Sequence, residues 1–343
     1  MMKSLKPRNP VHPFCWMLLL LILAAGRPAV AATCVTQAAM PSADRDLLAS
    51  IGSRLASAAA AQDYPVLKDA LLPAVSSDWE NIHSLVDQSA SLLKGGKIQI
   101  NALYVLDAST QTAPADTQFF CSNASGSLTV TINMRSLPPG RYALVLAEAT
   151  GSQYRGQISL ILAWDRSGGA PVWKLGGVNI HAGSLGGNDG VWYWSRAREL
   201  ARQDSPKYDP WSSFYTYELA RSLLVPVDFL SSPNLDRLEQ EEGQLKNSPQ
   251  QAFPLTLTDG PRSFKVESIL VDPALLQADL AVVYDANSAL TDPSAQRTEA
   301  IAVLSALLKT QPALRQNFHG LWALAVRDGK RSPVLEAPME QIP

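Results

Sequence analysis

Hydrophobic residues recur at two different spacings along the chain, and the change of spacing separates its regions. Between residues 44 and 96 apolar side chains return every three or four positions, which is the period of an amphipathic helix. Three helices are predicted there. Asp63 has the position of an N-cap for the second helix, and Ser77 with Glu80 has the spacing of a capping box for the third.

Beyond residue 96 the apolar period shortens to two, as in strands that are buried on one face. Pro-Pro-Gly, Gly-Ser and Ser-Gly-Gly turns separate the alternating segments, which predicts an antiparallel meander with a curved sheet. Helices followed by strands indicate an α+β fold. The predicted strands cover residues 97–106, 126–134, 141–149, 154–165 and 171–181.

Helical spacing returns behind a glycine-rich stretch at residues 186–187. Eight aromatic side chains lie between Trp192 and Tyr217, a density that composition alone does not explain. A turn at residues 204–210 divides this segment into two helices, which predicts a helical hairpin. The aromatic residues expected in the core that attaches the hairpin to the sheet are Trp192, Trp194, Trp211 and Tyr215.

Other side chains of the hairpin are candidates for binding. Tyrosine and arginine favour interfaces because both combine apolar surface with a polar end. We therefore expect a partner to be bound along a groove of the hairpin, with ligand stacking on the aromatic cluster as the alternative. The candidate binding residues are Tyr193, Tyr208, Tyr217, Arg198 and Arg202.

The last third of the chain combines a polar segment with a second mixed unit. Residues 231–253 are polar, with one short helix followed by a linker. Two alternating segments, an amphipathic helix behind Asp292-Pro293 and a closing strand then predict a C-terminal ββαβ unit. The pattern divides the chain into residues 1–31, 32–185, 186–247 and 248–343.

The first of these parts has the layout of a secretory signal peptide. Basic residues precede an apolar run at Phe14–Gly26, and Ala29-Val30-Ala31 has the form of a cleavage site. The run has 13 residues, whereas a helix needs ~20 to cross the bilayer core. Cleavage near Ala31, a periplasmic or secreted location and no membrane span after cleavage are predicted. An uncleaved N-terminal membrane anchor is the alternative.

The charge balance excludes one class of partner. The chain has 29 Lys and Arg against 31 Asp and Glu. Removal of residues 1–31 deletes Lys3, Lys6, Arg8 and Arg27 but no acid, which leaves 25 bases against 31 acids and a net charge of about −6. Nucleic-acid binding needs clustered Lys and Arg, so we exclude nucleic acid as a partner.

The cysteines also bear on the compartment. Cys15 leaves with the signal peptide, so Cys34 and Cys121 remain in a compartment that permits disulfides. A bond between them is expected, and two separate buried thiols are the alternative.

Three leading helices followed by a curved meander that ends in a hairpin from Trp164 to Trp173 resemble the ketosteroid-isomerase-like cone, also called the nuclear-transport-factor-like fold. The resemblance covers about residues 44–183. It implies a cavity inside the cone that could hold a small apolar molecule.

Two further resemblances concern later segments. The hairpin, with "WSSFYTYELARSLLVP" as its second helix, resembles a single tetratricopeptide-type unit, although the Leu-Gly pair of that family is missing. The segments "GGNDGVWYWSRAREL", "YELARSLLVPVDFLSSPNLDRL" and "QPALRQNFHGLWALAV" resemble a group of uncharacterised secreted bacterial proteins of the kind found in Acidobacteria. That resemblance implies no activity.

No motif specifies a reaction. The chain lacks a nucleophile elbow, a Walker loop, a dinucleotide fingerprint and a zinc-protease helix, and neither a metal nor another cofactor is predicted. In a cone cavity, burial can tune the pKa of a carboxylate or histidine for acid/base work. By strand position the catalytic candidates are His181, Tyr104 and Glu148.

Three functions therefore compete. The absence of a catalytic motif and the aromatic hairpin favour an extracytoplasmic, non-enzymatic interaction or assembly protein, whose partner is another envelope or secreted protein. The alternatives are a binder of a small apolar ligand in the N-terminal cone and an acid/base enzyme of the isomerase or dehydratase type.

Overall fold

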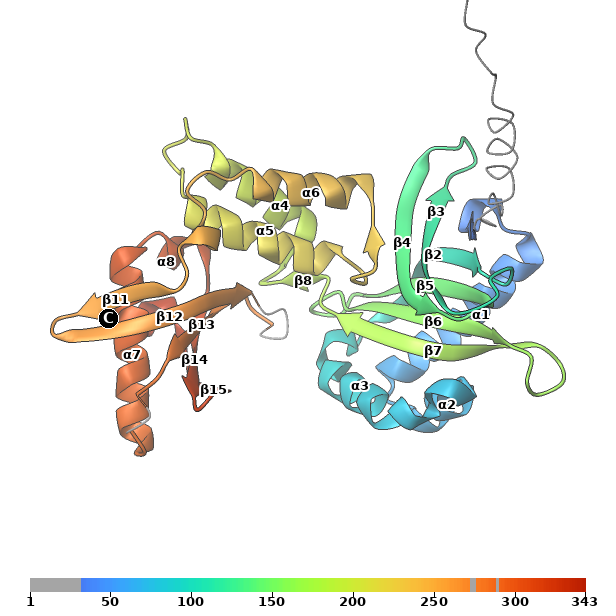
Figure 1. Cartoon of the computed structure of the whole chain (residues 1–343), viewed down its shortest axis with the longest axis horizontal. Helices are drawn as coiled ribbons and strands as arrows, with labels where there is room; N and C mark the ends of the chain where they lie inside the picture. The colour runs from blue at the N-terminus through green and yellow to red at the C-terminus, as the bar shows by residue number, and fades with distance from the viewer. Residues whose placement is uncertain (1–31, 272–275, 288–289) are drawn as a thin grey trace, which may run out of the picture.

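The computed structural model describes residues 32–271, 276–287 and 290–343, so the predicted signal peptide lies outside the described residues. Helices and antiparallel sheets confirm the α+β class. Figure 1 shows an N-terminal sheet with its helices at one end, a helical layer in the middle and a C-terminal sheet with its helices at the other end. Within the described ranges no helix is long and apolar enough to cross a membrane.

Helices cover one face of the N-terminal sheet, to which its strands direct alternate side chains. Val145 and Leu160 point to this face and are fully buried in the main core. A Cβ on Gly52 would lie 2.7 Å from Val145 Cγ1, so α1 lies directly on the sheet. The strand order is β1 (Thr33–Thr36), β2 (Lys97–Asp107), β5 (Arg141–Thr150), β6 (Gln157–Asp165) and β7 (Val172–His181), and the helices are α1 (Ser42–Ala60), α2 (Tyr64–Ala70) and α3 (Trp79–Leu93).

The starts of α2 and α3 test the predicted caps. Asp63 caps α2 by accepting a hydrogen bond of 3.3 Å from the backbone N–H of Val66. The predicted capping box at Ser77 is wrong, because Ser77 lies inside a 3-10 turn, Pro73–Asp78, that precedes α3. Asp78 holds the N-cap position of α3 and makes no side-chain capping hydrogen bond.

The predicted single meander is wrong in one respect. β3 (Ala115–Ser122), which the alternation did not predict, pairs with β4 (Leu128–Leu137) and leaves the first sheet. This hairpin forms a second sheet with β10 (Leu230–Ser231), while β2 pairs directly with β5. The separation follows from burial, since Phe119 and Ile132 form a second core against the sheet face opposite α1 and α3, here called the outer face.

A disulfide joins β1 to β3. Cys34 and Cys121 are bonded with their Cα atoms 5.0 Å apart, which confirms the predicted pairing. The cysteines are 87 residues apart in sequence. A loop of this length stabilises a fold by about 4 to 5 kcal/mol in the chain-entropy model. The bond therefore fixes the end of the described chain to the second sheet.

The predicted helical hairpin consists of α4 (Gly190–Ala201) and α5 (Pro210–Leu224). Asp189 caps α4 through the N–H of Trp192, and Asp209 caps α5 through the N–H of Trp211. The short strands β8 (Ser184–Leu185) and β9 (Asn188–Asp189) lead into it, and α6 (Pro233–Gly243) packs beside α5.

The buried stripe of α4 is rotated by about one residue from the prediction. Tyr193, Ala197 and Leu200 are buried, whereas Trp192, expected in the core, is 47% exposed. A Cβ on Gly190 would lie 2.5 Å from Leu224 Cγ. Because this approach presses the Gly190 side of α4 against α5, the next residues on that face are Tyr193 and Ala197. Of the other aromatics expected in the core, Tyr215 is buried. Trp194 and Trp211 are partly buried and pack against the main core.

The C-terminal unit is larger than the predicted ββαβ. β13 (Asp279–Asp285) and β14 (Gly320–Arg327) are parallel and are connected by α7 (Pro293–Thr310) and α8 (Leu314–Asn317). The predicted strand before β13 is β12 (Arg262–Val271), and the sequence patterns missed two outer strands. These are β11 (Leu255–Asp259) and β15 (Lys330–Pro338), each joined to its neighbour as an antiparallel hairpin.

The close contact at Gly190 gives a test of how the hairpin packs. Gly190→Ala introduces a methyl group where Leu224 and the helix backbone already lie, so we expect a loss of about 1 to 3 kcal/mol of folding free energy. Gly243→Ala in α6 is the matched control, because its Cβ meets no atom within 4 Å and alanine favours a helix. Thermal unfolding of both variants measures the difference. Equal melting of Gly190→Ala and the parent would contradict this packing.

Candidate functional site

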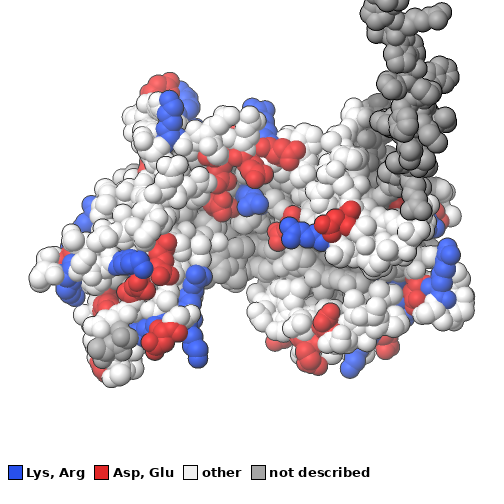
Figure 2. All heavy atoms as spheres, in the orientation of Figure 1, with Lys and Arg blue, Asp and Glu red and all other residues white. Residues whose placement is uncertain are grey.

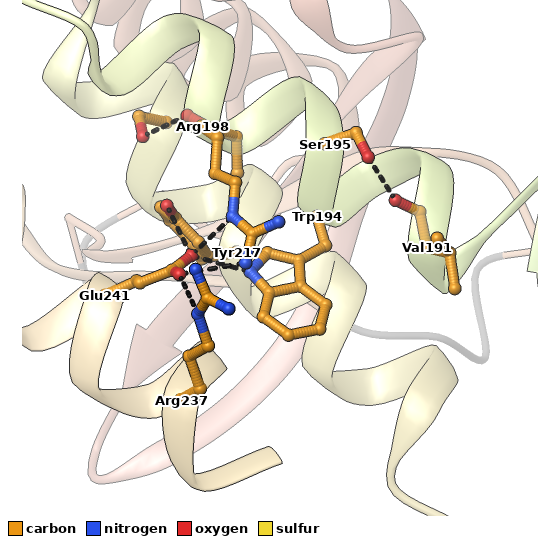
Figure 3. A network of polar contacts seen from close by, with 9 residues as sticks. Val191, Trp194, Ser195, Arg198, Tyr217, Arg237 and Glu241 are labelled. Carbon is orange, nitrogen blue, oxygen red and sulfur yellow. Dashed lines mark hydrogen bonds and ion pairs between the residues drawn. The ribbon is translucent and has the colours of Figure 1, made fainter. Parts of the chain in front are cut away.

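A carboxylate on α6 gathers side chains from all three helices of the middle layer (Figure 3). Glu241 accepts hydrogen bonds from the Arg198 guanidinium at 2.7 and 2.8 Å and from Arg237 Nε at 2.9 Å. The indole Nε1 of Trp194 donates to the same carboxylate at 2.9 Å, and the Tyr217 hydroxyl lies 3.5 Å from it. Glu241 thus holds α4, α5 and α6 together through one charged group.

The electrostatics of this network favour the ionised carboxylate. The hydrogen bonds from Arg198, above all, and those from Trp194 and Arg237 lower the pKa of Glu241 to about 2. Arg198 also lies over the Trp194 ring, with its guanidinium carbon 4.2 Å from the ring centroid. This stacking holds the guanidinium in one place and leaves it partly exposed, at 41% of its side-chain surface.

Beside this network lies a groove of about 450 Å³. It brings together four of the five candidate binding residues, Arg198, Arg202, Tyr208 and Tyr217. Sequence reasoning missed the α6 side of the groove, although the spacing of Arg237 and Glu241 is that of an i, i+4 ion pair. We call this surface the arginine groove and define it by Arg198, Arg202, Tyr208, Tyr217, Arg237 and Lys246.

Two of the predicted binding residues are buried. Tyr193 is 4% exposed and does not line the arginine groove. Its hydroxyl donates to the carbonyl of Leu185 at 3.0 Å. Tyr193 is therefore largely buried and is not part of the arginine groove. Tyr217 is 2% exposed, so it contributes little surface to the groove. Tyr208 is partly exposed at the groove wall.

The three catalytic candidates share the outer face of the N-terminal sheet but do not meet. Glu148 and His181 lie in one cross-strand row with Gln157 between them, which separates them by about 10 Å at the usual strand spacing. Glu148 is held by Arg155 at 2.7 Å. Tyr104 lies further along the sheet and packs against the second core, and burial raises the pKa of its hydroxyl. These residues do not form an acid/base constellation.

His181 instead lines a cavity of about 530 Å³ between β6, β7 and the C-terminal half of α5. Glu218 and Arg221 reach it from α5, and Asp228 reaches it from the loop that follows. We call it the sheet cavity. It lies on the outer face, whereas the face covered by α1 and α3 is packed with the side chains of the main core. The cone resemblance implies a cavity on the helix-covered side, so the sheet cavity is a different feature.

Behind the sheet cavity a second carboxyl approaches Glu218. Glu242 of α6 is only 6% exposed. Burial first, and then the charge of Glu218 and a hydrogen bond with it, raise the pKa of Glu242, while Arg221 opposes the shift. The raised pKa favours the protonated form of Glu242 where α6 packs on α5.

The described residues contain no group of three or more His, Cys, Asp or Glu side chains arranged to hold a metal ion. Comparison of the chain with protein-family models, with curated proteins and with solved structures finds no match.

The buried carboxyl of Glu242 predicts a pH-dependent stability. Because its pKa is raised above the ordinary value of 4.5, its contribution to stability is complete below pH 4.5 and is lost as the pH rises through the raised value. Glutamine imitates the protonated carboxyl. We therefore expect Glu242→Gln to melt about 3 to 6 °C above the parent at pH 9 and close to it at pH 5.

The control for this comparison is Glu336→Gln, an exposed glutamate on β15 that takes no part in the shift of Glu242. Its melting difference from the parent should be small at both pH values. If the parent and Glu242→Gln differ by the same amount at pH 5 and pH 9, the buried carboxyl does not titrate between them.

Proposed function

We propose that the protein is an exported, non-enzymatic binding protein whose arginine groove recognises an acidic segment of another envelope or secreted protein. The observation that carries this proposal is the local excess of positive charge. Arg198, Arg202, Arg237 and Lys246 line the groove, and Glu241 is the one carboxylate in its lining. Even with Asp204 paired to Arg202, the groove region has four cations and two carboxylates, an excess that favours a partner that supplies carboxylates.

The excess is local to the groove. The whole chain has slightly more acids than bases, and acidic and basic side chains are interspersed over the face shown in Figure 2. A cationic groove on such a surface gives an acidic partner a preferred orientation, because elsewhere on the surface the partner would be repelled by carboxylates.

The guanidinium groups keep donors for a ligand. Glu241 takes only Nε of Arg237, which is 66% exposed, so the terminal nitrogens of that guanidinium extend into the groove region. Arg202 is also 66% exposed and pairs with the exposed Asp204 at 3.2 Å, a contact that an incoming carboxylate can replace at small cost. Tyr208 adds a partly exposed ring beside these donors. This set suits an acidic peptide segment with an aromatic residue.

Export is part of the proposal. The bond between Cys34 and Cys121 fits a compartment that permits disulfides. The basic start and short apolar run of the sequence fit a signal peptide, as does the Ala-Val-Ala site.

A direct binding experiment tests the groove. The purified protein is titrated into a fluorescein-labelled twelve-residue peptide of repeated Glu-Asp-Tyr, and into the matched peptide of Gln-Asn-Tyr, with fluorescence anisotropy as the readout. We expect the acidic peptide to bind at least about tenfold more tightly and to weaken as salt rises. The double variant Arg202→Gln/Arg237→Gln should lose most of that preference.

Lys330→Gln is the control, because this exposed lysine begins β15, outside the groove lining. It should bind the acidic peptide as the parent does. Equal binding of the two peptides, or undiminished binding by the arginine double variant, would overturn the proposed function.

A further inference from the structure

A third hollow lies between the helical hairpin and α8. Its volume of about 390 Å³ is in the range of small-molecule sites. The lining comes from α4, from Thr216 of α5, and from Gln316 and Asn317 of α8. Trp192 belongs to this lining and is 47% exposed, so a ligand can reach its indole ring. We call the hollow the tryptophan groove.

The spacing of α4 explains which of its side chains meet here. Trp192, Arg196 and Glu199 are three or four residues apart, which places them on one face of the helix. Tyr193 and Ala197 are buried in the core, so the neighbouring face that carries Trp192 is turned outward. The indole therefore offers a flat apolar surface beside polar side chains, instead of filling the core.

The polar side chains of the tryptophan groove are held by one another. Arg196 donates to Glu199 and, through Nη2, to Asn317 Oδ1 at 2.9 Å. Lys207, which lies outside the lining, donates to the other carboxylate oxygen of Glu199 at 2.7 Å. The hydrogen bonds from Lys207 and Arg196 lower the pKa of Glu199, so it remains an ionised acceptor. A network that is ordered in advance reduces the entropy lost on binding.

The charges within this lining balance, because one guanidinium faces one carboxylate. The other polar groups are uncharged. Gln316 is exposed, and its amide can both donate and accept, as can the hydroxyl of Ser195. Hydroxyl groups of a ligand also donate and accept. The lining therefore favours a neutral ligand with several hydroxyl groups over an ion.

The aromatic part of the tryptophan groove has one accessible face. The ring of Tyr193 meets that of Trp192 edge-on, with the centroids 5.0 Å apart, and Tyr193 is buried. It cannot provide a second stacking surface parallel to the indole, as a sandwiched planar ring would need. A pyranose with equatorial hydroxyls has an apolar face of axial C–H groups, which packs on a single aromatic ring and leaves the hydroxyls at the rim.

We propose that the tryptophan groove binds a neutral saccharide, whose pyranose face stacks on Trp192 and whose hydroxyl groups hydrogen-bond with Glu199, Gln316 and Asn317. The inference does not depend on the proposed function, because the arginine groove has a different lining.

Four probes test the proposal. Cellobiose supplies glucopyranose faces, sorbitol supplies hydroxyl groups without a ring, and nicotinamide supplies a planar aromatic ring. Each is titrated into the protein while the indole ¹H–¹⁵N resonances are followed by NMR. We expect cellobiose to bind at least about tenfold more tightly than sorbitol or nicotinamide and to shift the resonance of Trp192. Trp164 and Trp173, which lie outside the lining, should keep theirs. Cellohexaose, the fourth probe, distinguishes the source of the saccharide, since tighter binding than cellobiose indicates a polysaccharide segment and equal binding a free sugar.

Variants of the indole test the stacking. Trp192→Ala should abolish cellobiose binding, while Trp192→Phe, which keeps a smaller aromatic face, should weaken it about three- to tenfold. Val191→Ala is the control, because this neighbouring side chain is 58% exposed and lies outside the lining. It should bind cellobiose as the parent does. Unchanged indole resonances of Trp164 and Trp173 show that each variant is folded.

Variants of the amide test the hydroxyl contacts. Gln316→Ala should weaken cellobiose at least about threefold. Gln240→Ala, at an exposed glutamine of α6 outside the lining, is its control and should change nothing.

Three outcomes would overturn the proposal. These are cellobiose binding no tighter than sorbitol, nicotinamide binding as tightly as cellobiose, and undiminished cellobiose binding by Trp192→Ala. Arg202→Gln/Arg237→Gln should leave cellobiose binding intact, so failure of the arginine-groove proposal and failure of this one are observed separately.

Discussion

The structure depends on how the C-terminal end of α5 is bound to the outer face of the N-terminal sheet. The last carbonyls of a helix have no partner inside it, and Pro226 prevents the helix from continuing. Gln157 Nε2 donates to the carbonyl of Leu223 at 3.0 Å, and Ser159 and Asn179 both donate to the carbonyl of Pro226. Polar side chains on a largely buried sheet face are thus satisfied by one carbonyl in the last turn of α5 and by one in the loop just after it.

This contact positions both candidate sites. With the end of α5 fixed, α4 is placed by the Gly190–Leu224 approach and by the hydrogen bond from Ser213 Oγ to the Ala197 carbonyl. Glu241 then holds α6 against the same pair of helices. Tyr217 of α5 reaches the arginine groove, and Glu218 and Arg221 of the same helix reach the sheet cavity. One helix therefore contributes side chains to both the arginine groove and the sheet cavity.

Sequence patterns predicted the features that depend on local periodicity. The helical hairpin, the short helix α6, the Asp63 cap and the Cys34–Cys121 bond follow from spacing, capping chemistry and cysteine count. The departure of β3 and β4 into a second sheet did not, because alternation defines a strand but not its neighbour. The rotation of α4 was missed for a related reason. Trp194 and Tyr193 are adjacent, and it is packing against parts of the chain distant in sequence that buries Tyr193 more deeply than Trp194.

The arginine groove was predicted from its α4 and α5 residues, and the α6 half was missed because its residues lie in a polar segment without apolar periodicity. Glu241 and Arg237 gain their roles only when α6 packs beside α5. For the sheet cavity, His181 was identified by strand position alone, and Glu218 and Asp228 could not be associated with it without the docking of α5.

The most direct test of this account is hydrogen exchange of the double variant Ser159→Ala/Asn179→Ala, measured by mass spectrometry against the parent and against Ser57→Ala, an exposed serine on α1. Removing both donors leaves the Pro226 carbonyl without its sheet partners. The account predicts faster exchange in residues 218–231, with β2 unchanged and Ser57→Ala exchanging like the parent. Unchanged protection of residues 218–231 would show that the polar row on the sheet does not hold the helix, and would contradict the account.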